Sequence, residues 1–140
     1  VGKVEAAIAR APNNRKKMDV SKHESARHAV THYQARESFI GGKVSHVACH
    51  LETGRTHQIR VHMAHIGHPV LGDGVYGAGM KSRTRHLDDA ATAALTALER
   101  QALHAQLLGF EHPATGEAMT FEASLPDDLA RLLTALENMQ

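Results

Sequence analysis

Hydrophobic and polar residues alternate along three stretches in the first half of the chain, and this pattern predicts β-strands. Successive side chains of a strand point to opposite faces, so a period of two marks a half-buried strand. Gly41 and Gly42 lie between the second and third stretches and predict a hairpin turn. The polar segment 15–26 is expected to be an exposed loop. The predicted strands are Val4–Ala11, Val30–Phe39 and Val44–Leu51.

Apolar residues three and four positions apart predict helices elsewhere. The clearest stripe follows Pro126, a residue that suits the first turn of a helix. A shorter helix is expected over 56–66, with Thr56 as the N-cap and Gly67 as the left-handed residue that ends it. The segment Leu87–Arg100 is rich in Ala and Leu and predicts another helix. The stripe after Pro126 consists of Leu129, Leu132, Leu133 and Leu136.

The remaining apolar segments, Ala102–Phe110 and Met119–Ala123, are expected to pair as strands across a turn rich in Pro and Gly. The sequence therefore predicts an α+β fold, with a mainly antiparallel mixed sheet and flanking helices. A length of 140 residues allows at most one domain.

Composition narrows the class of protein only slightly. The chain is 42% hydrophobic and 22% charged, which is typical of a globular protein, and no apolar run approaches the ~20 residues of a membrane span. Cys49 is the only cysteine, so no disulfide forms within the chain, and a reducing cytoplasm is expected. The net charge is +1, but basic residues gather near 15–22 and 81–85, whereas 117–137 is mostly acidic. This division is compatible with a polyanion on one face, although ordinary solvated charge is favoured on this pattern alone.

The densest polar cluster lies in residues 51–62, where a strand is expected to end and the short helix to begin. The first turn of a helix has unpaired N–H groups that favour an anion, and Arg55 lies beside them. Arg60 shares a helix face with His57 and Ala64, and a partly buried arginine needs a carboxylate partner. The helix contains no acidic residue. On spacing alone, solvated or routinely paired Arg55 and Arg60 are the favoured reading.

The histidines and glycines suggest two other kinds of site, both weakly. Twelve histidines include a run with spacing of three, but a zinc site would need a further ligand and a carboxylate base, so no metal is expected. A G-x-G-x-x-G pattern begins at Gly72, but it follows Pro69 rather than a long strand, so it does not predict a dinucleotide site. The histidine run is His62, His65 and His68.

The cluster at 51–62 resembles the signature of the RluA-type pseudouridine synthase family. Further blocks follow in the family's order, so the resemblance covers nearly the whole chain. The quoted blocks are Leu51-Glu52-Thr53-Gly54-Arg55-Thr56-His57-Gln58-Ile59-Arg60-Val61-His62, Gly67-His68-Pro69-Val70-Leu71-Gly72-Asp73, Tyr76-Gly77, Arg100-Gln101-Ala102-Leu103-His104-Ala105 and Phe110-Glu111-His112-Pro113.

The resemblance implies isomerisation of uridine to pseudouridine in RNA, without a cofactor or metal. In the family, an aspartate in a His-Arg-Leu-Asp motif attacks a flipped-out nucleotide. An arginine of the family forms a salt bridge to that aspartate. That arginine corresponds to Arg60, which overturns the solvated reading. A base-flipping enzyme also holds the RNA backbone with basic and polar groups. The residues expected to contact RNA are Arg55, His57, Gln58, Arg15, Lys16 and Lys17.

The chain departs from the family in lacking the His-Arg-Leu-Asp motif. His86-Leu87-Asp88-Asp89 lies after the arginine rather than before it and is rejected as the nucleophile. Residues 1–140 are therefore expected to form the C-terminal portion of a catalytic domain, inactive alone, without the N-terminal half or any S4-like domain, and with an exposed sheet edge. The parent is expected to be a cytoplasmic, monomeric enzyme acting on large-subunit ribosomal RNA. The alternatives are a transfer RNA substrate, a non-catalytic RNA-binding module, or a metal-dependent hydrolase.

Overall fold

The computed structural model describes residues 1–77 and 79–139, apart from the side chains of Arg15 and Phe110. The strands are β1 (Gly2–Glu5), β2 (Ile8–Ala11), β3 (Asn14–Val20), β4 (Val30–Phe39), β5 (Val44–Leu51), β6 (Leu107–Glu111) and β7 (Ala118–Glu122). The helices are η1 (Ile40–Gly42), α1 (Gln58–His65), α2 (Met80–Thr84), α3 (Asp89–Leu98) and α4 (Asp127–Glu137).

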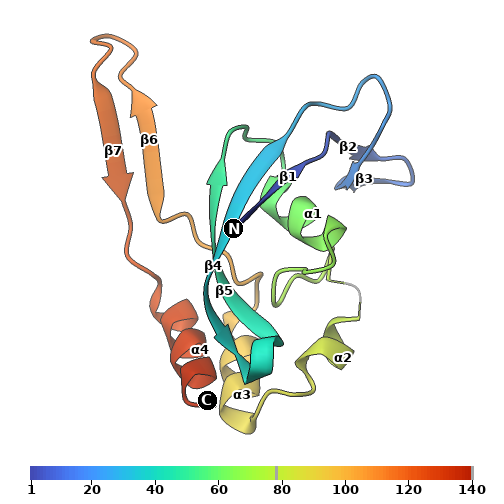
Figure 1. Ribbon diagram of the computed structural model, residues 1–140, viewed down its shortest axis with the longest axis vertical. Helices are drawn as coiled ribbons and strands as arrows, with labels where there is room; N and C mark the ends of the chain where they lie inside the picture. Colours follow the sequence, from blue (N-terminus) through green and yellow to red (C-terminus); the bar gives the residue numbers. More distant parts are fainter. Residues whose placement is uncertain (78, 140) are drawn as a thin grey trace.

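The described strands form antiparallel pairs in separate sheets. A three-stranded sheet has the order β1-β4-β5, while β2 pairs with β3 and β6 pairs with β7. The long β4–β5 hairpin runs along the molecule, with α3 and α4 at one end and β1, β2 and α1 towards the other (Figure 1). The expected α+β, mainly antiparallel fold is confirmed.

Two predicted elements near the N-terminus were wrong in detail. The expected strand Val4–Ala11 is divided between β1 and β2, because the amide of Ala6 turns to donate to Ala29 O at 3.1 Å. The expected loop 15–26 begins as strand β3, which pairs with β2. In β3 the half-buried Met18 and Val20 pack on an apolar cluster while Lys16 is exposed, so the alternation is present but is obscured by polar residues.

The helices agree with the sequence pattern where an apolar stripe marks them. Asp88 caps α3 by accepting a hydrogen bond from the Ala91 amide at 2.8 Å. Gly67 has φ +86°, the left-handed conformation expected at the end of α1. The basic segment after Gly79 forms the short helix α2, which the apolar pattern did not predict.

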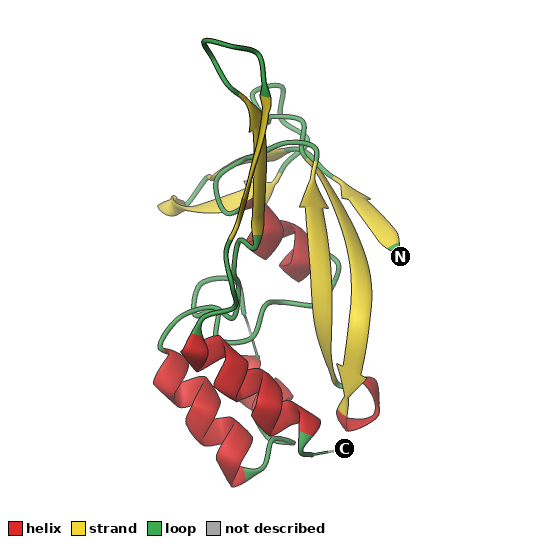
Figure 2. Cartoon of the chain, turned by 90° about the vertical axis from the view of Figure 1, so that its left-hand side faces the viewer, coloured by secondary structure: helices red, strands yellow, loops and turns green. Residues whose placement is uncertain are grey.

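Apolar packing is concentrated in two clusters. At the helical end, Phe39 from the tip of β4 packs with residues of α3 and α4, including the buried Leu132 and Leu136. The expected leucine stripe is therefore confirmed as the face that α4 presents to the core. Figure 2 shows this helical end opposite the projecting β6–β7 hairpin. The second cluster contains Ile8, Ala29, Val61 and Tyr76 and lies under α1.

The β6–β7 hairpin leaves large apolar side chains uncovered. Leu108 and Phe121 are cross-strand partners and are 59% and 52% exposed, and the neighbouring Leu107 is 61% exposed. Both views show the hairpin standing away from the helices (Figures 1 and 2). Within the described residues, no helix is long and apolar enough to cross a membrane.

Candidate active site around Arg60

Helix α1 begins at Gln58 rather than at Thr56, so the predicted threonine cap was wrong. The N-cap is His57, which has φ +54° and makes no side-chain cap hydrogen bond. Instead the Gln58 side chain turns back, and its Oε1 accepts from the Arg55 amide at 3.0 Å and from Thr53 Oγ1 at 2.8 Å. A glutamine carbonyl thus replaces the hydroxyl cap that the sequence suggested.

The amide end of Gln58 fixes α1 to strand β4. Its Nε2 donates to Val30 O and to Thr31 Oγ1, both at 2.9 Å. Gln58 is 3% exposed, so both ends of its side chain are bonded inside the molecule. The structure places this residue in the interior, where it aligns the site instead of facing solvent.

His62 continues the same polar network. Its Nε2 lies 2.8 Å from Ala6 O, an acceptor only, and its Nδ1 lies 2.8 Å from Thr31 Oγ1. Nε2 therefore carries a proton, and burial lowers the pKa of His62, which favours the neutral ring. Because both ring nitrogens are bonded, His62 is unsuited to a metal, and the described residues contain no cluster of His, Cys, Asp or Glu that could hold one.

Arg60 forms a bidentate ion pair with Asp73. Nε and Nη2 of Arg60 lie 2.8 and 2.9 Å from the two carboxylate oxygens. The Arg60 side chain is 12% exposed and that of Asp73 is fully buried. The helix itself contains no acidic residue, as the sequence shows, and the partner lies 13 residues further along the chain.

The loop after Gly72 holds the Asp73 carboxylate in place. The amides of Val75 and Tyr76 each donate to Asp73 Oδ1 at 3.0 Å. Burial opposes ionisation, but the hydrogen bonds from Arg60 and these amides outweigh it and lower the pKa of Asp73. Gly77 permits this turn, because a Cβ there would lie 2.3 Å from Asp73 O.

Pairing with Asp73 leaves one edge of the Arg60 guanidinium unused. A guanidinium has five N–H donors, and no residue in the described ranges bonds to Nη1. The hydrogen bonds that Arg60 donates to Asp73 also raise the pKa of Arg60, so the group stays charged. Its Cζ lies 5.0 Å from the centre of the Tyr76 ring, a cation–π distance that further fixes its plane.

Tyr76 connects three elements, a role that sequence reasoning missed. Its hydroxyl lies 2.9 Å from the Met18 amide of β3 and 2.8 Å from Nδ1 of His57. Lys17 Nζ lies 5.7 Å from the ring centre. The only sequence signal was the position of Tyr76 in a glycine-rich block, which gives no indication of a contact with β3.

Comparison with known proteins shows which family the chain resembles. Residues 1–65 match the family described as RNA pseudouridylate synthase. The chain is 47% identical over 137 residues to "Ribosomal large subunit pseudouridine synthase D" of Xylella fastidiosa, covering 96% of this chain and 39% of that protein. Over nearly its whole length, the chain is therefore similar to RNA pseudouridine synthases. It spans well under half the length of this curated relative.

Other relatives show the same similarity. "RNA pseudouridine synthase 2, chloroplastic" of Oryza sativa subsp. japonica is 42% identical, covering 99% of this chain and 34% of that protein. The solved structure of "Human RNA Pseudouridylate Synthase Domain Containing 1" gives a TM-score of 0.66 at 28% identity, covering 89% of this chain and 48% of that one. The solved structure of "Human RNA Pseudouridylate Synthase Domain Containing 4" gives a TM-score of 0.64 at 26% identity. It covers 97% of this chain and 56% of that one.

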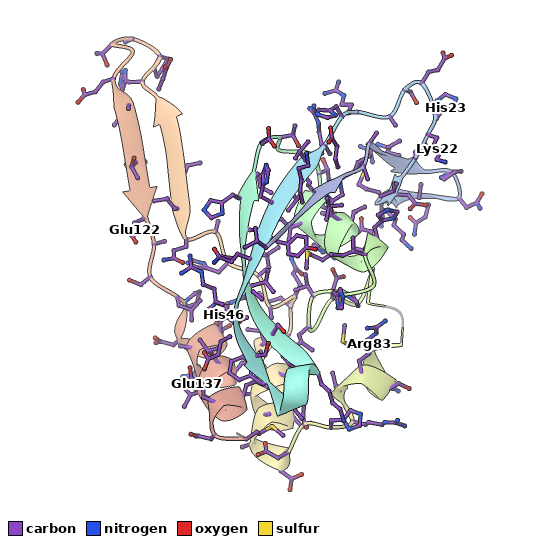
Figure 3. The ribbon with its side chains drawn as sticks, viewed as in Figure 1. Lys22, His23, His46, Arg83, Glu122 and Glu137 are labelled. Atoms are coloured by element: carbon purple, nitrogen blue, oxygen red, sulfur yellow. The ribbon has the colours of Figure 1, made fainter. Side chains whose placement is uncertain are left out.

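The structure brings several of the expected contact residues together. His57 lies against Tyr76, Lys17 lies over the same ring, and Arg55 Nε donates to His28 O at 2.8 Å. Lys16 is exposed on β3, and the side chain of Arg15 lies outside the described part. Lys22 and His23 lie on the opposite side of the molecule from Glu122 and Glu137 (Figure 3).

Proposed function

We propose that the chain is the C-terminal portion of the catalytic domain of a cytoplasmic, monomeric enzyme that isomerises uridine to pseudouridine in large-subunit ribosomal RNA. In this proposal Arg60 holds the catalytic aspartate, which the chain lacks, and the reaction needs no metal or cofactor. The observation that carries the proposal is the buried guanidinium of Arg60, fixed by Asp73 and left with one free edge.

The chemistry assigned to Arg60 follows from this geometry. A nucleophilic aspartate must be ionised, and an adjacent guanidinium favours the ionised form. Asp73 takes two of the five N–H donors of Arg60, so a second carboxylate can bind at the Nη1 edge. Asp73 and the Tyr76 ring hold the guanidinium rigidly, which would keep the nucleophile aimed at the target base.

The RNA-facing surface proposed here consists of the β2–β3 hairpin and the start of α1. Lysine and arginine side chains neutralise phosphates and supply most of the sequence-independent affinity for RNA. In this proposal Lys16, Lys17, Arg55 and His57 contact RNA on this surface, and Gln58 aligns them from the interior. The same contact is expected of Arg15.

Several features of the chain fit a larger domain. Leu107, Leu108 and Phe121 on the β6–β7 hairpin are more than half exposed, and β1 and β5 are the edges of their sheet. Exposed apolar residues and unpaired strand edges are normally covered by further chain. In our proposal the N-terminal half of the catalytic domain covers them and supplies the aspartate, so the 140 residues alone are inactive.

The test uses the full-length protein encoded by the complete reading frame. We expect pseudouridine in a large-subunit ribosomal RNA transcript, with undiminished activity in a metal chelator, when nucleosides are analysed by mass spectrometry. Pseudouridine found only in transfer RNA would show that transfer RNA, and not ribosomal RNA, is the substrate. Salt-sensitive RNA binding without any pseudouridine would instead identify a non-catalytic binding module.

The role of Arg60 is tested in the same assay. Arg60→Ala should reduce the rate of pseudouridine formation by about a hundredfold or more, the range for loss of a fixed electrostatic group at a reacting centre. Arg131→Ala, at an exposed position of α4, is the control and should leave the rate unchanged. Near-normal activity of Arg60→Ala would remove the role assigned to it.

A further inference from the structure

The hydroxyl of Tyr76 has a defined proton direction. The Met18 amide can only donate, so at 2.9 Å the Tyr76 oxygen accepts from it. Tyr76 is 8% exposed, and a buried hydroxyl proton needs an acceptor. The remaining partner recorded for the hydroxyl is Nδ1 of His57 at 2.8 Å. The Tyr76 hydroxyl therefore donates to Nδ1.

This hydrogen bond determines the tautomer of His57. A neutral imidazole has one N–H and one acceptor nitrogen, so an accepting Nδ1 places the proton on Nε2. The rings meet edge to face, with centres 5.6 Å apart and an interplanar angle of 76°, which also fixes the ring plane. No hydrogen-bond partner for Nε2 is recorded among the described residues, and His57 is only half-buried.

The backbone of His57 has an unusual conformation. Its φ of +54° lies in the left-handed region, where Asn or Gly would be less strained than His. The side chain does not compensate by capping α1. His57 thus adopts an unusual backbone conformation and leaves its side chain available for a partner other than the helix amides.

We infer that Tyr76 is a positioning residue that fixes His57 as a neutral imidazole, with Nε2–H presented as a hydrogen-bond donor to an acceptor oxygen of the bound RNA. The inference rests on the proposed function for the identity of the ligand. Tyr76 also contacts the Arg60 guanidinium and the Met18 amide of β3. One side chain therefore fixes the relative positions of His57, Arg60 and the β2–β3 hairpin.

The tautomer is tested first by NMR of the full-length protein labelled with ¹⁵N-histidine. The His57 signal, assigned by its loss in His57→Gln, should show a protonated Nε2 and an unprotonated Nδ1 at neutral pH. In Tyr76→Phe, which keeps the ring but removes the hydroxyl, the His57 signal should shift towards a tautomer mixture. A protonated Nδ1 in the wild-type protein would overturn the inference without any variant.

The donor role is tested by a pair of substitutions with opposed structural effects. Glutamine places an amide N–H near the position of Nε2, whereas asparagine reaches only the position of Nδ1 but suits the left-handed backbone better. We expect His57→Gln to bind RNA about tenfold more tightly than His57→Asn, the value of a hydrogen bond to a charged or polar acceptor. If asparagine were equal or better, the role of His57 would be purely structural and the inference would fail.

A salt titration identifies the kind of donor. A neutral imidazole displaces no counterion, so His57→Ala should weaken RNA binding without changing the slope of log affinity against log salt. Arg55→Ala should reduce the magnitude of that slope by about one, the value for the loss of one phosphate contact. A reduced slope for His57→Ala would show a charged contact and contradict the inference. None of these readouts requires pseudouridine formation, so failure of the inference and failure of the proposed activity are separable.

Discussion

The two ends of the β4–β5 hairpin are joined to the rest of the molecule by different kinds of interaction. At the helical end, Phe39, Leu132 and Leu136 form an apolar cluster between α3 and α4. At the other end, α1 is joined to the sheet by Thr31, Gln58 and His62 through hydrogen bonds of 2.8–2.9 Å. Apolar packing tolerates small shifts, whereas a directional network fixes positions, so the network lies where Arg60 must be placed accurately.

Each end also contains an ion pair between an arginine and an aspartate, and the two pairs differ in burial. Arg60–Asp73 has side-chain exposures of 12% and 0%, while Arg100–Asp128 has 37% and 33%. Removing one partner of a buried pair leaves an uncompensated charge, but an exposed charge is readily solvated. The comparison therefore predicts unequal effects from chemically identical substitutions.

The largest effect is expected from Asp73→Ala in the full-length protein. Loss of this carboxylate should lower the free energy of unfolding by about 3–5 kcal/mol, because the Arg60 charge and the amides of the loop lose their partner. Asp128→Ala is the matched control and should cost about 0–1 kcal/mol. Urea unfolding measures both, and equal losses would show that burial does not separate the two pairs.

A somewhat smaller effect is expected from Leu132→Ala at the helical end. Leu132 is 2% exposed, and removing its side chain should cost about 2–4 kcal/mol through lost burial and the cavity that remains. The rate of pseudouridine formation below the unfolding transition should stay near the wild-type value, because the change lies in the other cluster. A loss of activity without loss of stability would show that the two ends are coupled.

Thr31→Val tests the polar network with almost no change of shape. The substitution leaves Nδ1 of His62 and one N–H of Gln58 without their partner, so it should cost about 1–3 kcal/mol. Thr120→Val, at an exposed position of strand β7, should be close to neutral. A neutral Thr31→Val would mean that the hydrogen bonds at α1 contribute little to stability.

The smallest effect is the pH dependence caused by His62. Burial lowers its pKa below the ordinary 6.5, so below pH 6.5 the unfolded chain binds a proton that the folded chain excludes. The contribution of His62 to stability is therefore complete above pH 6.5 and declines as the pH falls from there towards the folded pKa. The urea concentration at the unfolding midpoint should decrease as the pH is lowered from 7 to 5. This decrease should be smaller in His62→Gln.

The contrast between the two ends also explains what could be predicted from the sequence. The stripe of Leu132 and its neighbours has a helical period, so the buried face of α4 was correctly expected. The pairing of β4 with β5 followed from alternation and the turn at Gly41. Both rest on interactions between residues that are close in sequence or regular in period.

The polar site was predicted less well because its partners are distant and follow no period. Arg60 and His57 were singled out, but Asp73 and Tyr76 were not recognised as their partners across 13 and 19 residues. The Thr56 cap failed because Gln58 supplies its own acceptor. Strand β3 was missed because Arg15, Lys16 and Lys17 obscure its alternation. Side-chain hydrogen bonds of this kind depend on tertiary geometry that a linear pattern does not encode.

The most direct test of the central claim is a crystal structure of the full-length protein. The account predicts an aspartate carboxylate, supplied from outside these 140 residues, within hydrogen-bond distance of Nη1 of Arg60, while Nε and Nη2 remain on Asp73. A guanidinium bonded to Asp73 alone, with the nucleophilic aspartate held by another group such as Arg55, would contradict it.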